Sequence, residues 1–547
     1  MKGDNDVKVC DLLIIGGGGA GALAAVEASK HENLNIVLVS KGPIGKSGLT
    51  PTANGGTAFH STPEGTLEEM VTAGCFLNDQ SLVRIMAEEA LKILEKLKGF
   101  GIGSVPIRPV SRCILPSDLL PALRKIILQS PHIELLEDVL ITRLLMKDGH
   151  AAGATALNLA TGEFFTFKAK AVVVATGGLV GEMYPHTSNN PFGVTTDSSG
   201  TGHAMAYSAG AELMDLEMIQ FVPLPGNPRC RNLRYFPEFW DGPYLNRHGD
   251  VVEDDVSAYA GKTYSHQFVQ KIVREMEKGN GPIVVDRRDF PRKHSALKVR
   301  SWTLRRKLIS KLDIDPHDHR IEIIIGSHFG MGGIKVNEKT ETSLSGLFAA
   351  GEVMGGVHGG LRLAGCSFTQ MIVFGLLAGR HASRHALSQK AFHDLSKDEV
   401  DSEKERVFGF LEKKKDALSL AEIKGELQGI MADHVFVLRD RNGLKKAIID
   451  LGNLRQEVRR ISVPGFRRFN LEWARSIEFE LMAQIAEVIA QSALVREESR
   501  GFHFRRDFPA QNNADWLKHV IVKQQSHQAL FTTKPVSLEH LRPETSS

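Results

Sequence analysis

The sequence predicts an α/β fold: a Rossmann-like nucleotide-binding domain, an inserted lid-like (capping) domain and a C-terminal helical domain. Three observations predict it. An apolar strand beginning at Asp11 runs into a glycine-rich turn and an Ala-rich helix. Between Leu216 and Ile324, aromatic residues and arginines cluster and no sheet periodicity dominates. Beyond a polar stretch that ends at Lys404, apolar residues recur at helical spacing.

The glycine-rich turn carries the pattern Gly-x-Gly-x-x-Gly. Gly16 allows the tight turn, Gly18 lets the backbone approach a pyrophosphate, and Gly21 lets the helix pack closely on the strand. A helix from Ala22 to Ser29 and a second strand ending at Val39 complete a βαβ unit. The phosphate charge then lies at a helix N-terminus, where free N–H groups favour an anion. The unit therefore predicts dinucleotide binding.

The end of the second strand departs from the usual pattern. An acidic residue is expected there to bind a ribose 2′-hydroxyl. This chain has Ser40 and Lys41 instead. Serine can bond a hydroxyl and lysine can approach a phosphate, so the departure weakens an NAD interpretation and still allows a dinucleotide.

Composition excludes several other classes of protein. The 547 residues are 42% hydrophobic and 24% charged, as in a soluble globular protein of more than one domain. A net charge of +3 is too mild to indicate nucleic-acid binding. No apolar run approaches the roughly 20 residues that span a bilayer, and the first residues lack a signal-peptide core. The five cysteines are scattered without a metal-binding spacing. We expect a cytoplasmic protein with no metal centre and no membrane insertion.

The rest of the chain predicts the order of the domains. The pattern predicts a ligand-wrapping loop of small residues over 42–56, a helix over Gln80–Lys98 and a buried strand over Ala171–Gly178. A polar hinge is expected over Ser388–Lys404, and a surface-wrapping tail from about Gln511. The predicted boundaries are 1–215 and 325–387 for the two parts of the nucleotide-binding domain, 216–324 for the inserted domain, 388–510 for the helical domain and 511–547 for the tail.

Several ordered motifs resemble the flavoprotein subunits of succinate dehydrogenase and fumarate reductase, together with L-aspartate oxidase and adenylylsulfate reductase. Besides the glycine turn and Ser40-Lys41, they are Ala53–Gly56, Ala175–Gly178, Met218–Phe221, Ser327–Ile334, Gly346–Val353, His358–Phe368 and Ser492–His503. The resemblance runs along nearly the whole chain. It implies FAD as cofactor, a capping domain that moves and a C-terminal helical domain.

The resemblance also implies where FAD binds. The positions that match cofactor-binding positions of the family include those of the glycine turn. They are Gly16, Gly18, Gly19, Ala20, Gly21, Ser40, Lys41, Ser47, Gly48, Thr50, Asn54, Gly55, Gly56, Ala175, Thr176, Gly177, Thr201, Glu352, Ser367 and Phe368. Ser367 would face the isoalloxazine ring. Members with covalent FAD carry a histidine where this chain has Leu49, so the cofactor is expected to be non-covalent.

The substrate positions match the family only in part. His328 and Arg362 would hold a substrate carboxylate, because a guanidinium binds a carboxylate bidentately. The family's His-Pro-Thr reads Val222-Pro-Leu224, and its Thr-Glu pair falls in 227–242 without a counterpart. The arginine that donates a proton in fumarate reductases becomes Ser265, with His266 beside it.

Serine is a poor general acid at neutral pH, so the proton donor stays open. Lys262, His266 or Arg274 could replace Ser265, and the arginines at 229–234 and 287–288 could serve an anion of another shape. These departures argue against plain fumarate or succinate chemistry.

The leading hypothesis is an FAD-dependent oxidoreductase that passes a hydride between flavin and a small carboxylate-bearing or other anionic substrate. The alternatives are an enzyme like L-aspartate oxidase or adenylylsulfate reductase, and a non-catalytic flavin electron-transfer subunit. The resemblance implies an iron–sulfur partner subunit, through which the chain could lie at a membrane. Trp473 and Arg505-Arg506 are expected to be available for docking it.

Overall fold

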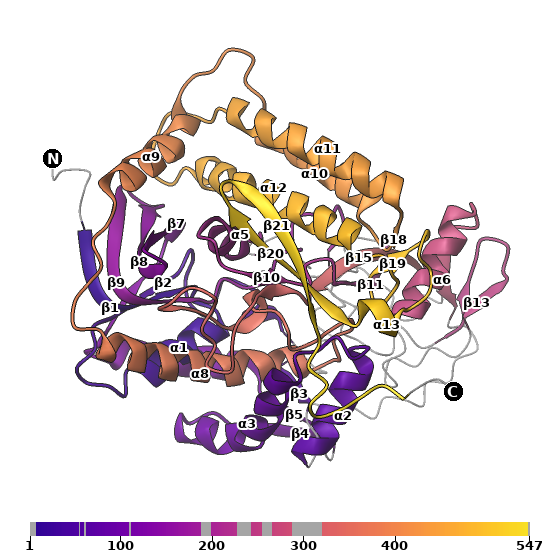
Figure 1. Cartoon of the computed structure of the whole chain (residues 1–547), viewed down its shortest axis with the longest axis horizontal. Helices are drawn as coiled ribbons and strands as arrows, with labels where there is room; N and C mark the ends of the chain where they lie inside the picture. Colours follow the sequence, from indigo (N-terminus) through magenta and orange to yellow (C-terminus); the bar gives the residue numbers. More distant parts are fainter. Residues whose placement is uncertain are drawn as a thin grey trace.

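The computed structural model describes residues 7–53, 55–58, 62–108, 111–187, 198–226, 242–253, 265–286 and 320–544. Its central layer is a seven-stranded sheet with the order β6-β2-β1-β9-β8-β7, in which β17 also pairs with β9 (Figure 1). The strands are β1 (Val7–Ile15), β2 (Ile36–Val39), β6 (Ile133–Leu136), β7 (Val139–Lys147), β8 (His150–Asn158), β9 (Phe164–Val174) and β17 (Leu347–Ala349).

The predicted return of the chain to this sheet is confirmed. β9 pairs in parallel with β1, with Leu12 opposite Ala171 and Ile15 opposite Val174. β2, β6 and β17 extend the parallel part, whereas β7 and β8 form antiparallel pairs at the edge. Both faces of the parallel strands are covered, which is why they read as continuous apolar runs.

Two helices pack on one another beside this sheet. They are α1 (Gly19–Ala28) and α8 (Cys366–Ser388). Gly375 and Gly379 of α8 face the backbone of α1, where an added Cβ would collide with the main chain at Ala20 and Ala24. This close approach fixes the start of α8 beside the glycine turn.

A peripheral layer lies below these helices in Figure 1. It contains α2 (Pro63–Ala73), α3 (Gln80–Gly99) and a three-stranded sheet of β3 (Gly56–Ala58), β5 (Ser111–Cys113) and β4 (Val105–Arg108). The helix α4 (Pro116–Gln129) packs instead against α1 and β6. The predicted helix over 80–98 is α3, and the Asp79 side chain caps it by accepting from the backbone N–H groups of Ser81 and Leu82.

The inserted segment contains a sheet that the sequence did not predict. The antiparallel order is β11-β15-β14-β12-β13, and α6 (His266–Glu277) packs beside it. The strands are β11 (Ile219–Pro225), β12 (Tyr244–Leu245), β13 (Val251–Glu253), β14 (Ile283–Asp286) and β15 (Arg320–Gly330). Every residue of β11 is buried, so this strand shows no alternation of apolar and polar residues. β15 also continues across the predicted boundary at 324, which joins the inserted sheet directly to the site.

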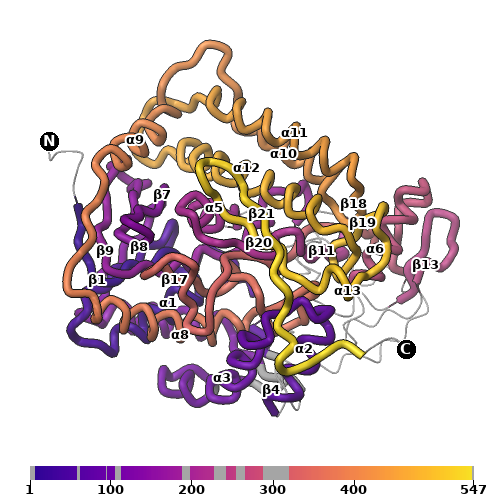
Figure 2. Tube along the Cα trace, in the orientation of Figure 1, coloured from indigo at the N-terminus to yellow at the C-terminus, as the bar shows by residue number. Residues whose placement is uncertain are grey.

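Four helices form the upper layer in Figures 1 and 2: α9 (Lys397–Phe408), α10 (Leu420–His434), α11 (Arg441–Glu457) and α12 (Leu471–Val495). The predicted polar hinge over 388–404 is wrong in its second half, which is α9. Only Glu403 and Val407 of α9 are buried, so the helix has almost no apolar stripe to reveal it.

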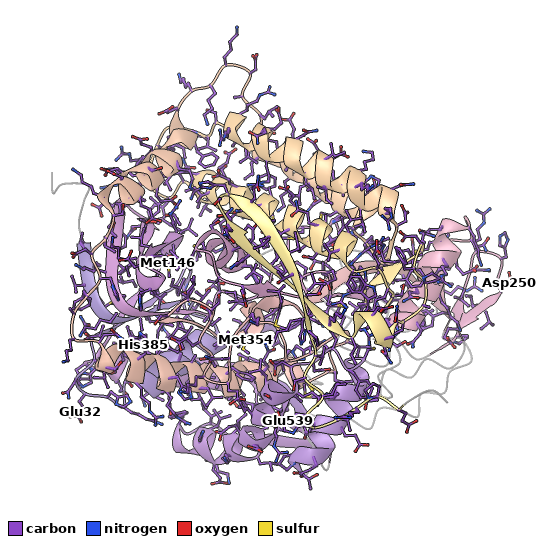
Figure 3. All side chains as sticks on the ribbon, in the orientation of Figure 1. Glu32, Met146, Asp250, Met354, His385 and Glu539 are labelled. Atoms are coloured by element: carbon purple, nitrogen blue, oxygen red, sulfur yellow. The ribbon has the colours of Figure 1, made fainter. Side chains whose placement is uncertain are left out.

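The tail forms two strands before it crosses the molecule. These strands are β20 (Lys518–Gln525) and β21 (Gln528–Pro535), which pair with one another. They belong to a four-stranded sheet with the order β16-β10-β20-β21, in which β10 is Leu213–Met214 and β16 is Gly333–Ile334. The chain then reaches the α2–α3 layer, where Glu539 is labelled in Figure 3 and Gln80 accepts from the N–H groups of His540 and Leu541. Among the described residues, no helix is long and apolar enough to cross a membrane.

Candidate active site

The glycine turn between β1 and α1 has the geometry of a ligand cradle. Gly16 has φ +116°, and a Cβ there would collide with the carbonyl of Ala175. A Cβ at Gly21 would collide with the carbonyl oxygen of Gly16. A Cβ at Gly18, in contrast, would meet only Thr50 Oγ1 at 3.7 Å. Two glycines are therefore required by the protein's own packing, whereas Gly18 leaves open space beside the N-terminus of α1 for a bound group.

Buried polar atoms without partners surround this cradle. Among the described residues, Thr176 Oγ1, Ser198 Oγ and Glu352 Oε1 are buried and accept or donate no hydrogen bond. Buried polar groups normally have partners. A Cβ at Gly178 would collide with both Glu352 Oε1 and Ser198 Oγ, so these two atoms lie close together against Gly178. The set fits a large polar cofactor that supplies the missing bonds.

Glu352 lies in the 3-10 turn η7 (Gly351–Val353), directly after β17. Burial raises the pKa of its carboxyl to about 8, although the nearby Arg362 guanidinium lowers it. In Figure 3, Met354 marks the end of this turn near the middle of the molecule, whereas Asp250 lies at the outer edge of the inserted segment. Glu352 Oε1 is buried and lies close to Gly178 and to Ser198 Oγ.

Arg362 lies in the loop before α8 and its residue is only 5% exposed. Its Nε donates to Gln220 Oε1 at 2.9 Å, and Gln220 Nε2 donates back to the Arg362 carbonyl oxygen at 3.1 Å. Nη1 donates to Leu363 O and to Ser367 Oγ. The guanidinium also lies 5.2 Å from the centre of the Phe329 ring. These contacts hold the guanidinium in one orientation.

His328 reaches Arg362 through a β-bulge. Gln220 of β11 pairs with Phe329 and the next residue, Phe221, pairs with Ser327, so His328 is the extra residue of β15. Its Nε2 lies 2.7 Å from Arg362 Nη2. Arginine can only donate, so Nε2 must be the acceptor and the ring proton lies on Nδ1. The structure brings together the two residues predicted to bind a carboxylate.

Gln220 is a site residue that sequence reasoning missed. It is fully buried, and its side chain clasps both the guanidinium and the backbone of Arg362. The sequence feature that could have indicated it is the single polar side chain, Gln220, inside the apolar segment Met218–Phe221. A second missed pair is His358 and Gln370, joined at 2.8 Å, with Gln370 Nε2 donating to the Gly351 carbonyl. This pair ties the Arg362 loop to the Glu352 turn.

Comparison with known proteins gives the family. The FAD binding domain family matches residues 11–112 and 116–368, and the fumarate reductase flavoprotein C-terminal family matches residues 424–547. One of the subunits of the fumarate reductase (CoM/CoB) of Methanothermobacter marburgensis is 32% identical, over 95% of this chain and 98% of its own.

The chain belongs to the fumarate reductase and succinate dehydrogenase flavoprotein family.

Solved structures agree. A mutant of the E. coli quinol fumarate reductase is 26% identical and superposes with a TM-score of 0.85, over 98% of both chains. Adenylylsulfate reductase of Archaeoglobus fulgidus, at 20% identity, shares the fold, with a TM-score of 0.79 over 97% of this chain and 96% of that chain. The protein is an FAD-dependent oxidoreductase of this family, and the predicted fold class and cofactor are confirmed.

Several of the predicted FAD-binding positions directly follow the carboxyl ends of β1, β2, β9 and β17. Ala175, Thr176 and Gly177 follow β9, Thr201 begins α5 (Thr201–Ser208), and Ser367 and Phe368 begin α8. Gly19 N–H donates to Thr50 Oγ1 at 3.1 Å, in the turn η1 (Thr50–Thr52) that Leu49 precedes. Four further predicted positions lie in or near the loop between β2 and β3. The Ser47 hydroxyl donates to the Pro43 carbonyl, and Gly48 has φ +75°. Gly55 lies against the Ile114 carbonyl, and Gly56 begins β3. Asn54 lies outside the described residues.

The residues considered as proton donors differ in their contacts in the structure. Ser265 is the N-cap of α6, where its hydroxyl accepts from Phe268 N–H at 3.2 Å. Arg274 is exposed and lies over the Phe504 ring. Lys262 and the arginines at 229–234 and 287–288 lie outside the described residues.

Among the described candidates, His266 is connected to the Arg362 loop through Phe502. Its ring packs edge-on against Phe502, whose N–H donates to the Gly360 carbonyl at 3.0 Å. Its Nδ1 is buried and has no hydrogen-bond partner. Burial lowers the pKa of His266 to about 4. The ring is therefore neutral at pH 7 and has one unused nitrogen.

Proposed function

We propose that this flavoprotein passes a hydride between its FAD and a small anionic substrate bound by Arg362 and His328, as one subunit of a larger electron-transfer complex. The observation that carries the proposal is the buried Arg362 guanidinium, oriented by Gln220 and in contact with His328. A buried, oriented guanidinium next to a neutral imidazole is suited to a carboxylate or a similar planar anion.

Arg362 and His328 have different roles in this proposal: Arg362 binds the substrate anion, and His328 polarises it. FAD supplies the hydride chemistry when it is bound. Arg362 donates to the substrate anion with N–H groups whose direction is fixed by Gln220. His328 carries its proton on Nδ1, because Nε2 accepts from Arg362. That N–H can donate to the oxygen on which negative charge develops as hydride adds to a neighbouring carbon–carbon double bond.

A double bond that takes up a hydride also needs a proton. His266 fits this role better than Ser265, whose hydroxyl caps α6. The Nδ1 of His266 is free, and a bound anion close to the ring favours its protonated form. In the oxidative direction the neutral ring accepts the same proton.

The substrate differs from a plain dicarboxylate such as fumarate. Val222 and Leu224 are buried apolar side chains in β11, where the family pattern has histidine and threonine. Neither side chain can donate a hydrogen bond to a second carboxylate. An amine oxidation like that of L-aspartate oxidase is an alternative in which Arg362 would hold the substrate carboxylate in the same way. A pure electron-transfer role would leave the Arg362–His328 pair unexplained.

The relatives support the proposal of partner subunits. Those from M. marburgensis and E. coli are each named as one of the subunits of a fumarate reductase. Because these relatives include both CoM/CoB and quinol enzymes, we propose that an iron–sulfur partner determines the electron donor, and that any membrane association comes through partners. Purification from the native source as a single chain with full activity would contradict this.

The expected docking residues need correction. Trp473 is 1% exposed and its Nε1 donates to the Val407 carbonyl. Arg505 is fully buried and pairs with Asp507. Arg506 is half-exposed and pairs with Glu277 of α6. Trp473 and Arg505 stabilise the fold and cannot contact a partner.

Reoxidation of the reduced flavin tests the proposed reaction. The FAD-loaded protein is reduced anaerobically and mixed with a panel of unsaturated mono- and dicarboxylates, and flavin absorbance is followed. We expect saturable reoxidation by at least one anion and loss of saturation in Arg362→Ala. Reoxidation by no anion, with normal electron exchange with a redox partner, would support the electron-transfer alternative.

A further inference from the structure

The carboxylate that the βαβ unit lacks is supplied by a distant part of the chain. β2 ends at Val39, and Ser40-Lys41 follow where an acid usually binds the ribose. In the structure, Lys41 Nζ lies 2.7 Å from Oε1 of Glu478, a residue of α12. The helical layer therefore brings a carboxylate to the end of the second strand of the nucleotide-binding unit.

The surroundings of Glu478 are those of a binding position. The α12 segment around it, from Trp473 to Phe479, is largely buried, and Glu478 itself is only 7% exposed. Burying a carboxylate costs free energy unless it is paired and hydrogen-bonded. Lys41 supplies the opposite charge, and Ser199 Oγ donates to Glu478 Oε1 at 3.3 Å. Groups from the end of β2, from the approach to α5 and from α12 thus meet at one point.

This point adjoins the glycine turn. A Cβ at Gly17 would overlap the side chain of Ser40, so the end of β2 lies against the turn that receives the pyrophosphate. The Ser40 hydroxyl donates to the Gly42 carbonyl at 2.6 Å, which commits its proton to the backbone. A ribose at this position needs an acceptor for its hydroxyl groups, and the carboxylate of Glu478 can accept more than one hydrogen bond.

We propose that Glu478 forms the adenosine subsite for FAD, where its carboxylate accepts hydrogen bonds from the ribose hydroxyl groups and Lys41 holds it in place. The helical layer is then part of the cofactor site, and FAD binding ties α12 to the nucleotide-binding sheet.

Competition with FAD for the apoprotein tests the subsite. The probes are ADP and 2′-deoxy-ADP, which differ by one ribose hydroxyl. We expect the wild-type apoprotein to prefer ADP about tenfold, since a hydrogen bond to a charged group contributes roughly 1.5–3 kcal/mol. In Glu478→Gln that preference is lost. Glu480→Gln is the matched control on the same helix, because Glu480 pairs with Arg406 away from β2.

The comparison separates binding from structural damage. A purely structural Lys41–Glu478 pair predicts that Glu478→Gln weakens both nucleotides equally and keeps their ratio. The proposal is overturned if the ratio survives in Glu478→Gln, or if the wild type shows no preference. Should Glu478→Gln not fold, Glu478→Asp retains the charge with a shorter reach and is expected to reduce the ratio, and an unchanged ratio there also overturns the proposal.

Discussion

His328 Nε2 lies 2.7 Å from Arg362 Nη2, and the contact exists because a β-bulge makes His328 the unpaired residue of β15. The two residues come from different elements, the inserted sheet and the loop before α8. Movement of the inserted segment would therefore change the distance between them. The relationship links the position of that segment to the geometry of the proposed anion site.

The glycine turn provides a matched pair of substitutions. Gly18→Val should fold with unchanged thermal stability and bind no FAD, because its side chain enters the space left for the cofactor. Gly21→Val should instead be strongly destabilised, because its Cβ collides with the Gly16 carbonyl. Far-UV circular dichroism and flavin content of the two purified variants distinguish them. Normal flavin content in Gly18→Val would refute the assignment.

Glu352 predicts a pH dependence of apoprotein stability. Burial raises the pKa of its carboxyl from 4.5 to about 8, so the folded state binds an extra proton between these values. The free energy of unfolding contributed by Glu352 is therefore highest below about pH 4.5 and falls as the pH rises to about 8. Urea unfolding of wild type and Glu352→Gln should show a difference that declines over this range. A difference that is constant with pH would show that Glu352 is not buried as described.

FAD should be bound without a covalent link. Leu49 precedes η1 at the position that carries a histidine in covalent members of the family, and leucine has no nucleophilic atom. Acid precipitation of the holoprotein should leave all flavin in the supernatant. Flavin that remains in the pellet would contradict this prediction.

Reduction of fumarate should be slow or absent. Val222 cannot bind a second carboxylate, and loss of a positioned acid lowers rates by roughly 10²–10⁴-fold. Ser265→Arg should not restore activity and should lose about 1 kcal/mol of stability, because the N-cap of α6 is removed. Steady-state assays with a reduced dye check the activity, and urea unfolding checks the stability. Fumarate reduction by the wild type on the order of 10–10³ s⁻¹ would contradict the prediction of slow or absent activity.

Local patterns explain what the sequence predicted correctly. The strand, the glycine turn and α1 are adjacent in the chain, so their periodicity and glycine spacing are sufficient. The anion-binding roles of Arg362 and His328, which the family resemblance implied, stay predictions, whereas the contact between the two side chains is observed. The α9 helix was missed because it buries only two residues, and the inserted sheet was missed because β11 is buried throughout.

The remaining site features depend on contacts between distant residues. Gln220 reaches Arg362 across 142 positions of the chain, and Lys41 meets Glu478 across 437. The bulge at His328 depends on the register between β11 and β15, which no single strand specifies. Similarly, only packing shows that Trp473 is enclosed and that the Ser265 hydroxyl caps a helix.

The central claim is that Arg362 and His328 together bind the substrate anion beside the flavin. A double-mutant cycle tests it most directly, with anion affinity measured from the flavin absorbance change in FAD-loaded wild type, Arg362→Lys, His328→Gln and the double variant. We predict that each single change weakens binding at least about tenfold and that the effects are not additive, because the residues contact one another. Unchanged anion affinity in Arg362→Lys and His328→Gln would contradict the claim.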